Sequence, residues 1–167
     1  DASIILRHAG KPDALDGYRS KSRQRVWEIA SAIYAAIANL GITYAVPPAS
    51  FERNGQKIRL PGAILENRTA TCLDSAMFCV SALEQAGLNP IVVLTEGHAL
   101  AGLWLQPEDL ASIVVEDAEL LRKRVQLNEL ILSETTFLTA SPAPSFSQAI
   151  AAGERGVAAD EAERICT

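Results

Sequence analysis

Apolar side chains recur at steps of three and four residues between Ser22 and Gly41, which is the spacing of one face of an α-helix. The repeating positions are Val26, Ala30, Ile33, Ile37 and Leu40. Gly41 lies where a helix commonly ends on a glycine in the left-handed conformation. The pattern therefore predicts a first long helix over about residues 22–40.

A second helix is predicted over residues 72–86. Thr71 is a favoured N-cap residue, and Asp74 stands three residues later, at the position that completes a capping box. Gly87 follows the last residue of the pattern. Because the segment is apolar on almost every side, we expect a central, buried helix and not a surface helix.

Short β-branched or alternating runs predict strands over 42–46, 90–94, 98–105 and 129–135. The charged segment 108–125 is predicted to be helical, and a last helix is expected to begin near Ser145, after Pro142 and Pro144. Since helices and strands do not alternate regularly as βαβ units, the order indicates the α+β class.

The length of 167 residues fits one domain, and an apolar content of 49% is enough for a sizeable core. We divide the chain into an N-terminal segment (1–21), a core (22–140) and a C-terminal helical tail (141–167), whose last ten residues are expected to be loosely held. The chain begins without Met and without the basic and apolar regions of a signal peptide. We therefore expect a domain cut from a longer protein, with the flanking domains of that protein as partners.

Composition and charge exclude several classes of function. The net charge is −5 and the longest basic run is Arg122-Lys-Arg124, so nothing points to direct nucleic-acid binding. No apolar run reaches the roughly 18–20 residues of a membrane span. Three cysteines, at positions 72, 79 and 166, do not make a disulfide framework and fit a reducing, cytoplasmic compartment. We expect neither a membrane partner nor a cofactor.

Cys72 is the main candidate for chemistry. It lies in the first turn of the predicted buried helix, where free backbone N–H groups and the helix dipole favour a thiolate. Most lone cysteines are structural, and Cys79, two helical turns further on, is expected to be buried and inert. His98 strengthens the catalytic interpretation, because an imidazole is the usual base that activates a thiol.

A third residue should accept a hydrogen bond from the imidazole and orient it. Glu134 is the first choice, because it follows a predicted strand whose end can lie beside the strand of His98. Asp117 is the alternative, although it is better explained as the N-cap of the charged helical residues after it.

Three segments surround these residues: Arg68-Thr-Ala-Thr-Cys72-Leu-Asp-Ser-Ala, Leu83-Glu-Gln-Ala-Gly-Leu-Asn-Pro90 and Gly97-His98-Ala-Leu-Ala-Gly-Leu-Trp104. Together they resemble the core of the transglutaminase-like superfamily, whose chemistry is papain-like. The resemblance covers about residues 22–140. The segment from Pro47 to Arg59 further resembles a bacterial subgroup embedded in large multidomain proteins, some with helicase-like regions.

This resemblance implies a buried helix that bears the cysteine and packs on an antiparallel sheet, with histidine and an acid on adjacent strands. It implies Cys72 as the nucleophile and His98 as the base. In the superfamily the acid is usually an Asp in an Asp-Pro-Thr-like strand end, whereas the matching segment here reads Glu134-Thr-Thr136.

An acyl-transfer site also needs donors for the developing oxyanion. The backbone N–H of Cys72 and the side-chain amide of Gln56 are the candidates. A metal site built on Cys72, Cys79 and His98 is not expected, because no C-x-x-C or H-x-x-x-H spacing supports it.

These residues predict a cysteine peptidase or amidase that acts on a protein or peptide substrate through a thioester on Cys72. One alternative is a protein transamidase, in which an amine instead of water resolves the same thioester. The other is a non-catalytic interaction or regulatory domain of a larger protein.

Overall fold

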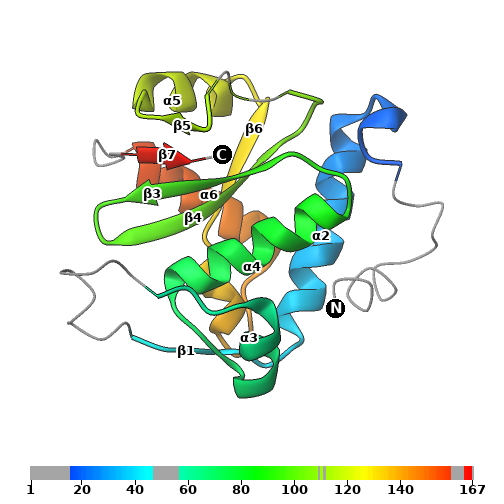
Figure 1. Ribbon diagram of the computed structural model, residues 1–167. Helices are drawn as coiled ribbons and strands as arrows, with labels where there is room; N and C mark the ends of the chain where they lie inside the picture. Colours follow the sequence, from blue (N-terminus) through cyan, green and yellow to red (C-terminus); the bar gives the residue numbers. More distant parts are fainter. Residues whose placement is uncertain (1–15, 47–56, 109, 111, 159–163, 167) are drawn as a thin grey trace.

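The computed structural model describes residues 16–46, 57–108, 110, 112–158 and 164–166 (Figure 1). Within them the fold is mixed α+β, with an antiparallel sheet packed on helices, as the element order predicted. The elements in chain order are η2 (Tyr18–Ser20), α2 (Arg23–Ala38), β1 (Thr43–Tyr44), α3 (Pro61–Asn67), β2 (Thr69–Ala70), α4 (Cys72–Gln85), β3 (Pro90–Thr95), β4 (His98–Trp104), β5 (Val114–Val115), α5 (Ala118–Gln126), β6 (Leu130–Ser133), η4 (Thr135–Thr139), α6 (Phe146–Ala158) and β7 (Arg164–Cys166).

The main sheet has the strand order β5-β7-β3-β4-β6, and every neighbouring pair is antiparallel. β3 and β4 form a hairpin with the two-residue turn Glu96-Gly97, in which Gly97 has φ +68°, a conformation that glycine adopts without strain. His98 is thus the first residue of β4. β6 pairs with the other side of β4, with Ser133 opposite Ala101. The chain that leaves β6 therefore runs toward His98.

A second sheet of two short strands lies at the start of α4. β1 runs parallel to β2, with Thr43 opposite Thr69 and Tyr44 opposite Ala70. The backbone N–H of Ala45 donates to the Ala70 carbonyl at 2.9 Å. Since β2 leads directly into α4, this pairing brings Tyr44 alongside the first turn of that helix.

Helices cover both faces of the main sheet (Figure 1). α2 and α4 pack on one face, in a core cluster that includes Ala101, Leu103 and Ile131 of the sheet. The second cluster, on the opposite face, contains Ile91, Val93, Leu100, Trp104, Leu121, Leu130, Leu132 and Val157. Successive residues of β6 thus enter different clusters, which confirms the alternation predicted for this strand.

Both long helices predicted from the sequence are present. α2 begins after Ser22, whose hydroxyl accepts from the Arg25 N–H. α4 begins after Thr71 with a complete capping box. Most of its side chains are buried, Phe78 and Leu83 among them, so the prediction of a central helix is confirmed.

α6 lies along β6, which is an edge strand of the main sheet. Ala149 is fully buried there, and a Cβ atom on Gly153 would come within 2.7 Å of the Leu132 carbonyl oxygen. The backbones of helix and strand are therefore in direct contact. The N–H of Glu134 donates to the Ala149 carbonyl at 2.9 Å. α6 therefore supplies a hydrogen-bond acceptor at the end of the edge strand and covers that end.

Two expectations are wrong. Residues 108–125 are not one helix: β5 occupies Val114–Val115 and α5 begins only at Ala118, because the β-branched run favours extended backbone and Asp117 is the N-cap. Residues 164–166, expected to be loosely held, form strand β7 between β5 and β3.

Candidate active site

Cys72 is the first residue of α4, directly after its N-cap. The Thr71 hydroxyl accepts from the Asp74 N–H at 3.2 Å, and Asp74 Oδ2 accepts from the Thr71 N–H at 2.9 Å. These reciprocal bonds fix the turn from which the Cys72 side chain projects. The backbone N–H groups of Leu73 and Ala99 lower the pKa of the Cys72 thiol, which favours the thiolate form.

Asp74 also ties a distant segment to the start of α4. Its carboxylate, which is fully buried, accepts from the backbone N–H of Arg59 at 2.7 Å and from the guanidinium of the same residue. Burial opposes ionisation, but the bonds from Arg59 and Thr71 outweigh it and hold the pKa of this carboxyl below its usual value. One carboxylate therefore caps the cysteine helix and anchors the chain that precedes α3.

The imidazole of His98 lies between Cys72 and Glu134. Its Nε2 is 2.7 Å from Glu134 Oε2, and the ring also hydrogen-bonds the Cys72 sulfur. Because Glu134 occupies Nε2, Nδ1 is left for the sulfur. The His98 side chain is 32% exposed, so the ring can be reached from solvent. Three residues from α4, β4 and the end of β6 thus form one chain of hydrogen bonds, the Cys72–His98–Glu134 row.

Both carboxylate oxygens of Glu134 are bonded. Oε1 accepts from the Thr136 N–H at 2.9 Å and from the Thr136 hydroxyl at 2.6 Å, and Oε2 is left to His98. Glu134 is also the N-cap of η4, and its own N–H is bonded to α6. A carboxylate held at this many points can fix the orientation of the imidazole.

The electrostatics of the row favour an ion pair between sulfur and ring. The hydrogen bond from His98 is the largest influence on the Cys72 thiol and lowers its pKa, although burial acts in the other direction. The bonds to Cys72 and Glu134 raise the pKa of His98 to about 10. Burial opposes ionisation of Glu134, but the bonds from His98 and Thr136 outweigh it, and its pKa lies below the usual value. All three shifts act in the direction of thiolate, imidazolium and carboxylate.

The alternatives weighed from the sequence have other roles in the structure. Asp117 Oδ1 accepts from the N–H groups of Glu119 and Leu120, both at 3.0 Å, and so caps α5. Cys79 is buried in the core against α2 and the sheet, and burial raises the pKa of its thiol to about 12. Gln56, the expected side-chain oxyanion donor, lies outside the described residues.

Tyr44, which the sequence pattern did not single out, also reaches the nucleophile. Its phenol lies close enough to Cys72 for the thiol and the backbone N–H of that residue both to act on the pKa of the phenol. Tyr44 is 45% exposed, whereas Cys72 is only 5% exposed. This contact arises from the pairing of β1 with β2, which brings together segments that lie far apart in the sequence.

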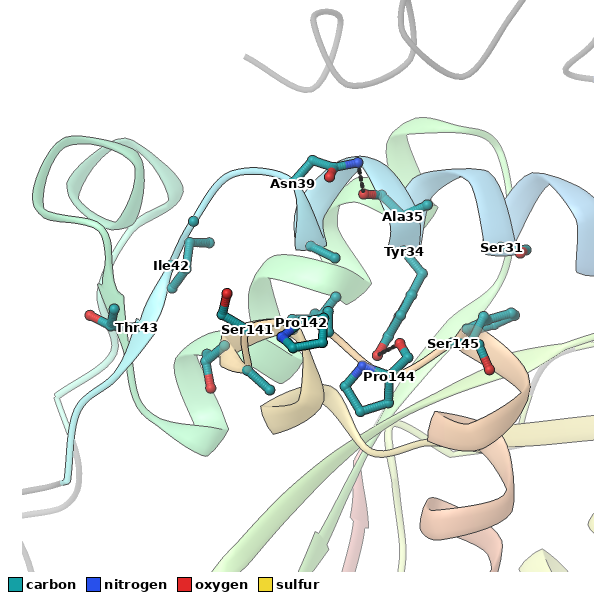
Figure 2. A pocket seen from close by; sticks show the side chains of 17 residues that line it. Ser31, Tyr34, Ala35, Asn39, Ile42, Thr43, Ser141, Pro142, Pro144 and Ser145 are labelled. Atoms are coloured by element: carbon teal, nitrogen blue, oxygen red, sulfur yellow. Dashed lines mark hydrogen bonds between the residues drawn. The ribbon is translucent and has the colours of Figure 1, made fainter.

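A cavity of about 770 Å³ borders the same region, between the C-terminal half of α2, β1 and the segment 138–146 (Figure 2). Tyr34 lies in its wall, with its hydroxyl bonded to the Pro144 carbonyl at 3.2 Å. No residue of the row lines the cavity. Thr43, which does line it, directly precedes Tyr44, so the cavity adjoins the candidate site through β1.

Among the residues that the structure describes, no three His, Cys, Asp or Glu side chains are grouped as metal ligands. No helix in that part of the chain combines the length and the hydrophobicity that a membrane span needs. Comparison with protein-family models, curated proteins and solved structures gives no match to this chain. The functional interpretation therefore depends on the geometry of the row.

Proposed function

We propose that the chain is a transglutaminase-like thiol enzyme that hydrolyses amide bonds of a protein or peptide substrate. The observation that carries this proposal is the continuous series of hydrogen bonds from Glu134 through His98 to the Cys72 sulfur. Thiol acyl transfer needs a nucleophile, a base and an orienting acid within hydrogen-bond reach of one another. The cysteine-bearing buried helix packed on an antiparallel sheet supports the same family.

In the first half of the proposed reaction, the Cys72 thiolate attacks the carbonyl carbon of the amide. A C–S bond forms and the carbonyl π electrons move to oxygen, where the backbone N–H of Cys72 can donate a hydrogen bond. As the intermediate collapses, the His98 imidazolium gives its proton to the amide nitrogen. The C–N bond breaks, the amine leaves, and a thioester remains on Cys72.

In the second half, neutral His98 takes a proton from a water molecule whose oxygen adds to the thioester carbonyl. The C–S bond then breaks, which releases the carboxylic acid and restores the thiolate and the imidazolium. Glu134 stabilises the charged ring whenever it forms and holds it in one plane. The proposal uses no cofactor.

Transamidation is the alternative within the same chemistry, because an amine can replace water in the second half. The non-catalytic alternative is disfavoured by the electrostatics of the row. A thiol with a lowered pKa beside an imidazole with a raised one is typical of a reactive site, and an interaction surface has no need of it.

The test is to incubate the protein with a library of N-acylated peptide amides, with and without the primary amine cadaverine, and to identify products by mass spectrometry. A carboxylic acid product supports hydrolysis, and a cadaverine adduct supports transamidation instead. Cys72→Ala and His98→Ala should abolish either product. Cys79→Ala, a change at a buried thiol outside the row, should retain it. If no product forms and Cys72 is alkylated no faster than a free thiol, the enzyme proposal is wrong.

A further inference from the structure

The phenol of Tyr44 contacts Cys72 at the two groups that acyl transfer would use. One is the sulfur, which is the proposed nucleophile, and the other is the backbone N–H, which is the proposed oxyanion donor. The Tyr44 phenol is therefore near the atom that would form the new bond and near the group that would stabilise the new charge.

Packing does not explain why the Tyr44 side chain lies there. The ring is 45% exposed and belongs to a strand of two residues, so it contributes little to either core cluster. Its position is instead set by the backbone. The register of β1 on β2 places Tyr44 opposite Ala70, and two residues later the chain reaches Cys72.

We propose that Tyr44 is a further catalytic residue, whose hydroxyl donates a hydrogen bond to the oxyanion formed on the substrate carbonyl. This inference rests on the proposed function, since it assigns a role within the same acyl transfer. It supplies a side-chain donor from the described part of the chain to act together with the Cys72 N–H.

The geometry of the bond to be formed supports this role. A carbonyl carbon that bonds to the Cys72 sulfur carries its oxygen toward the Cys72 N–H, the region that the Tyr44 hydroxyl now borders. The substrate oxygen replaces the hydroxyl as the acceptor of that N–H. The hydroxyl, still within reach, then turns its proton toward the new negative charge, which is the placement an oxyanion donor requires.

The protonation state of the phenol is also suitable. Burial raises the pKa of Tyr44, and the nearby negative charges of Cys72 and Glu134 add to this effect against the opposing bond from the Cys72 N–H. A phenol whose pKa is raised keeps its proton at neutral pH and remains a donor.

The test compares Tyr44→Phe with wild type in two reactions of the same thiol. Acylation by p-nitrophenyl acetate transfers the acetyl group to sulfur through an oxyanion and releases p-nitrophenolate, whereas alkylation by iodoacetamide displaces iodide from carbon and forms no oxyanion. Tyr44→Phe should slow the acylation burst by about 10²–10³-fold, the usual cost of losing one oxyanion donor. The alkylation rate should change far less.

Thr43→Val is the matched control, because Thr43 lies on the same strand and its hydroxyl bonds the Arg68 carbonyl at 3.0 Å. It should leave the acylation burst close to wild type. The role of Tyr44 would be overturned if Tyr44→Phe left the acylation burst unchanged or slowed acylation and alkylation equally. It would also be overturned if Thr43→Val slowed the burst as much as Tyr44→Phe. The proposed function itself fails if the wild-type protein shows no acylation burst, or if the burst persists in His98→Ala. Either result would also remove the inference about Tyr44.

Discussion

His98 Nε2 and Glu134 Oε2 lie 2.7 Å apart although 36 residues separate them in the sequence. The pairing of β4 with β6 produces this contact, because Ser133 lies opposite Ala101 and the chain then continues toward the start of β4. The bonds from Thr136 hold the carboxylate in place. The acid–base pair is therefore assembled by sheet register and not by a flexible loop.

Cys72 should be the reactive thiol of the chain. Brief treatment with iodoacetamide at about pH 6.5, where a thiol with a pKa of about 8.5 reacts slowly, should modify Cys72 well ahead of Cys79. The reason is that His98 lowers the pKa of the first thiol, whereas burial raises the pKa of the second to about 12. Mass spectrometry of both peptides from one sample measures the ratio. Preferential labelling of Cys79 would contradict the assignment of the nucleophile.

Glu134→Gln should lower turnover by roughly 10²–10⁴-fold, because the amide no longer holds a charged imidazole in place. Asp117→Asn is the control. An asparagine at this position still caps a helix, and Asp117 bonds only the first turn of α5, so its loss should leave activity near wild type. The rate of thiol alkylation can be measured where no substrate is known. If Asp117→Asn lost its activity while Glu134→Gln kept that of wild type, the orienting acid would be misassigned.

The pH dependence should differ between alkylation and amide cleavage. His98 lowers the pKa of Cys72, so the thiolate persists as the pH falls below the usual thiol pKa, and His98→Ala should move the midpoint of alkylation up toward about 8.5. On the alkaline side, His98 loses its proton as the pH rises through about 10. Amide cleavage needs that proton for the leaving amine and should decline there, whereas alkylation should not.

A pH series of both rates on the same preparation measures the two effects. Coincident profiles for alkylation and amide cleavage at high pH would mean that His98 is not the proton donor. An unchanged alkylation midpoint in His98→Ala would mean that the ring does not stabilise the thiolate.

Gly153→Ala should lower the free energy of unfolding by about 1–3 kcal/mol, the usual cost of an overpacked core position. The added Cβ would lie 2.7 Å from the Leu132 carbonyl oxygen, and backbone atoms of β6 cannot move aside cheaply. Gly156→Ala in the same helix meets nothing within 4 Å and should raise stability by up to about 1 kcal/mol, the helix propensity gained. Denaturant unfolding measures both, and equal effects would contradict the close contact of α6 with β6.

Much of the fold could be predicted because its signals are local. Thr71 and Asp74 mark the start of α4 within four residues, and Gly97 marks the turn of the hairpin. Each residue of the candidate site stands at one end of a helix or strand: Cys72 begins α4, His98 begins β4 and Glu134 follows β6. The sequence therefore indicated which residues can meet, whereas the distances between them depend on strand pairing.

The features that could not be predicted depend on pairing between distant segments. Tyr44 reaches Cys72 only because β1 pairs with β2, and a strand of two residues carries too little alternation to reveal its partner. β7 is likewise short, and its partners β3 and β5 lie far away in sequence. Charged residues around Asp117 suggested a longer helix, but the cap and the β-branched run before it decide where α5 begins.

β4 and β6 are neighbours in the sheet, yet the chain makes a long excursion between them over residues 105–129. The excursion begins after Trp104, the last residue of β4, and ends before Leu130, the first residue of β6, and these two residues face each other at the opposite end of β4 from His98. Seven residues of strand, about 20 Å, separate the two ends. Both junctions of the excursion are therefore remote from the Cys72–His98–Glu134 row, and a change in its length would act first on the far end of the sheet.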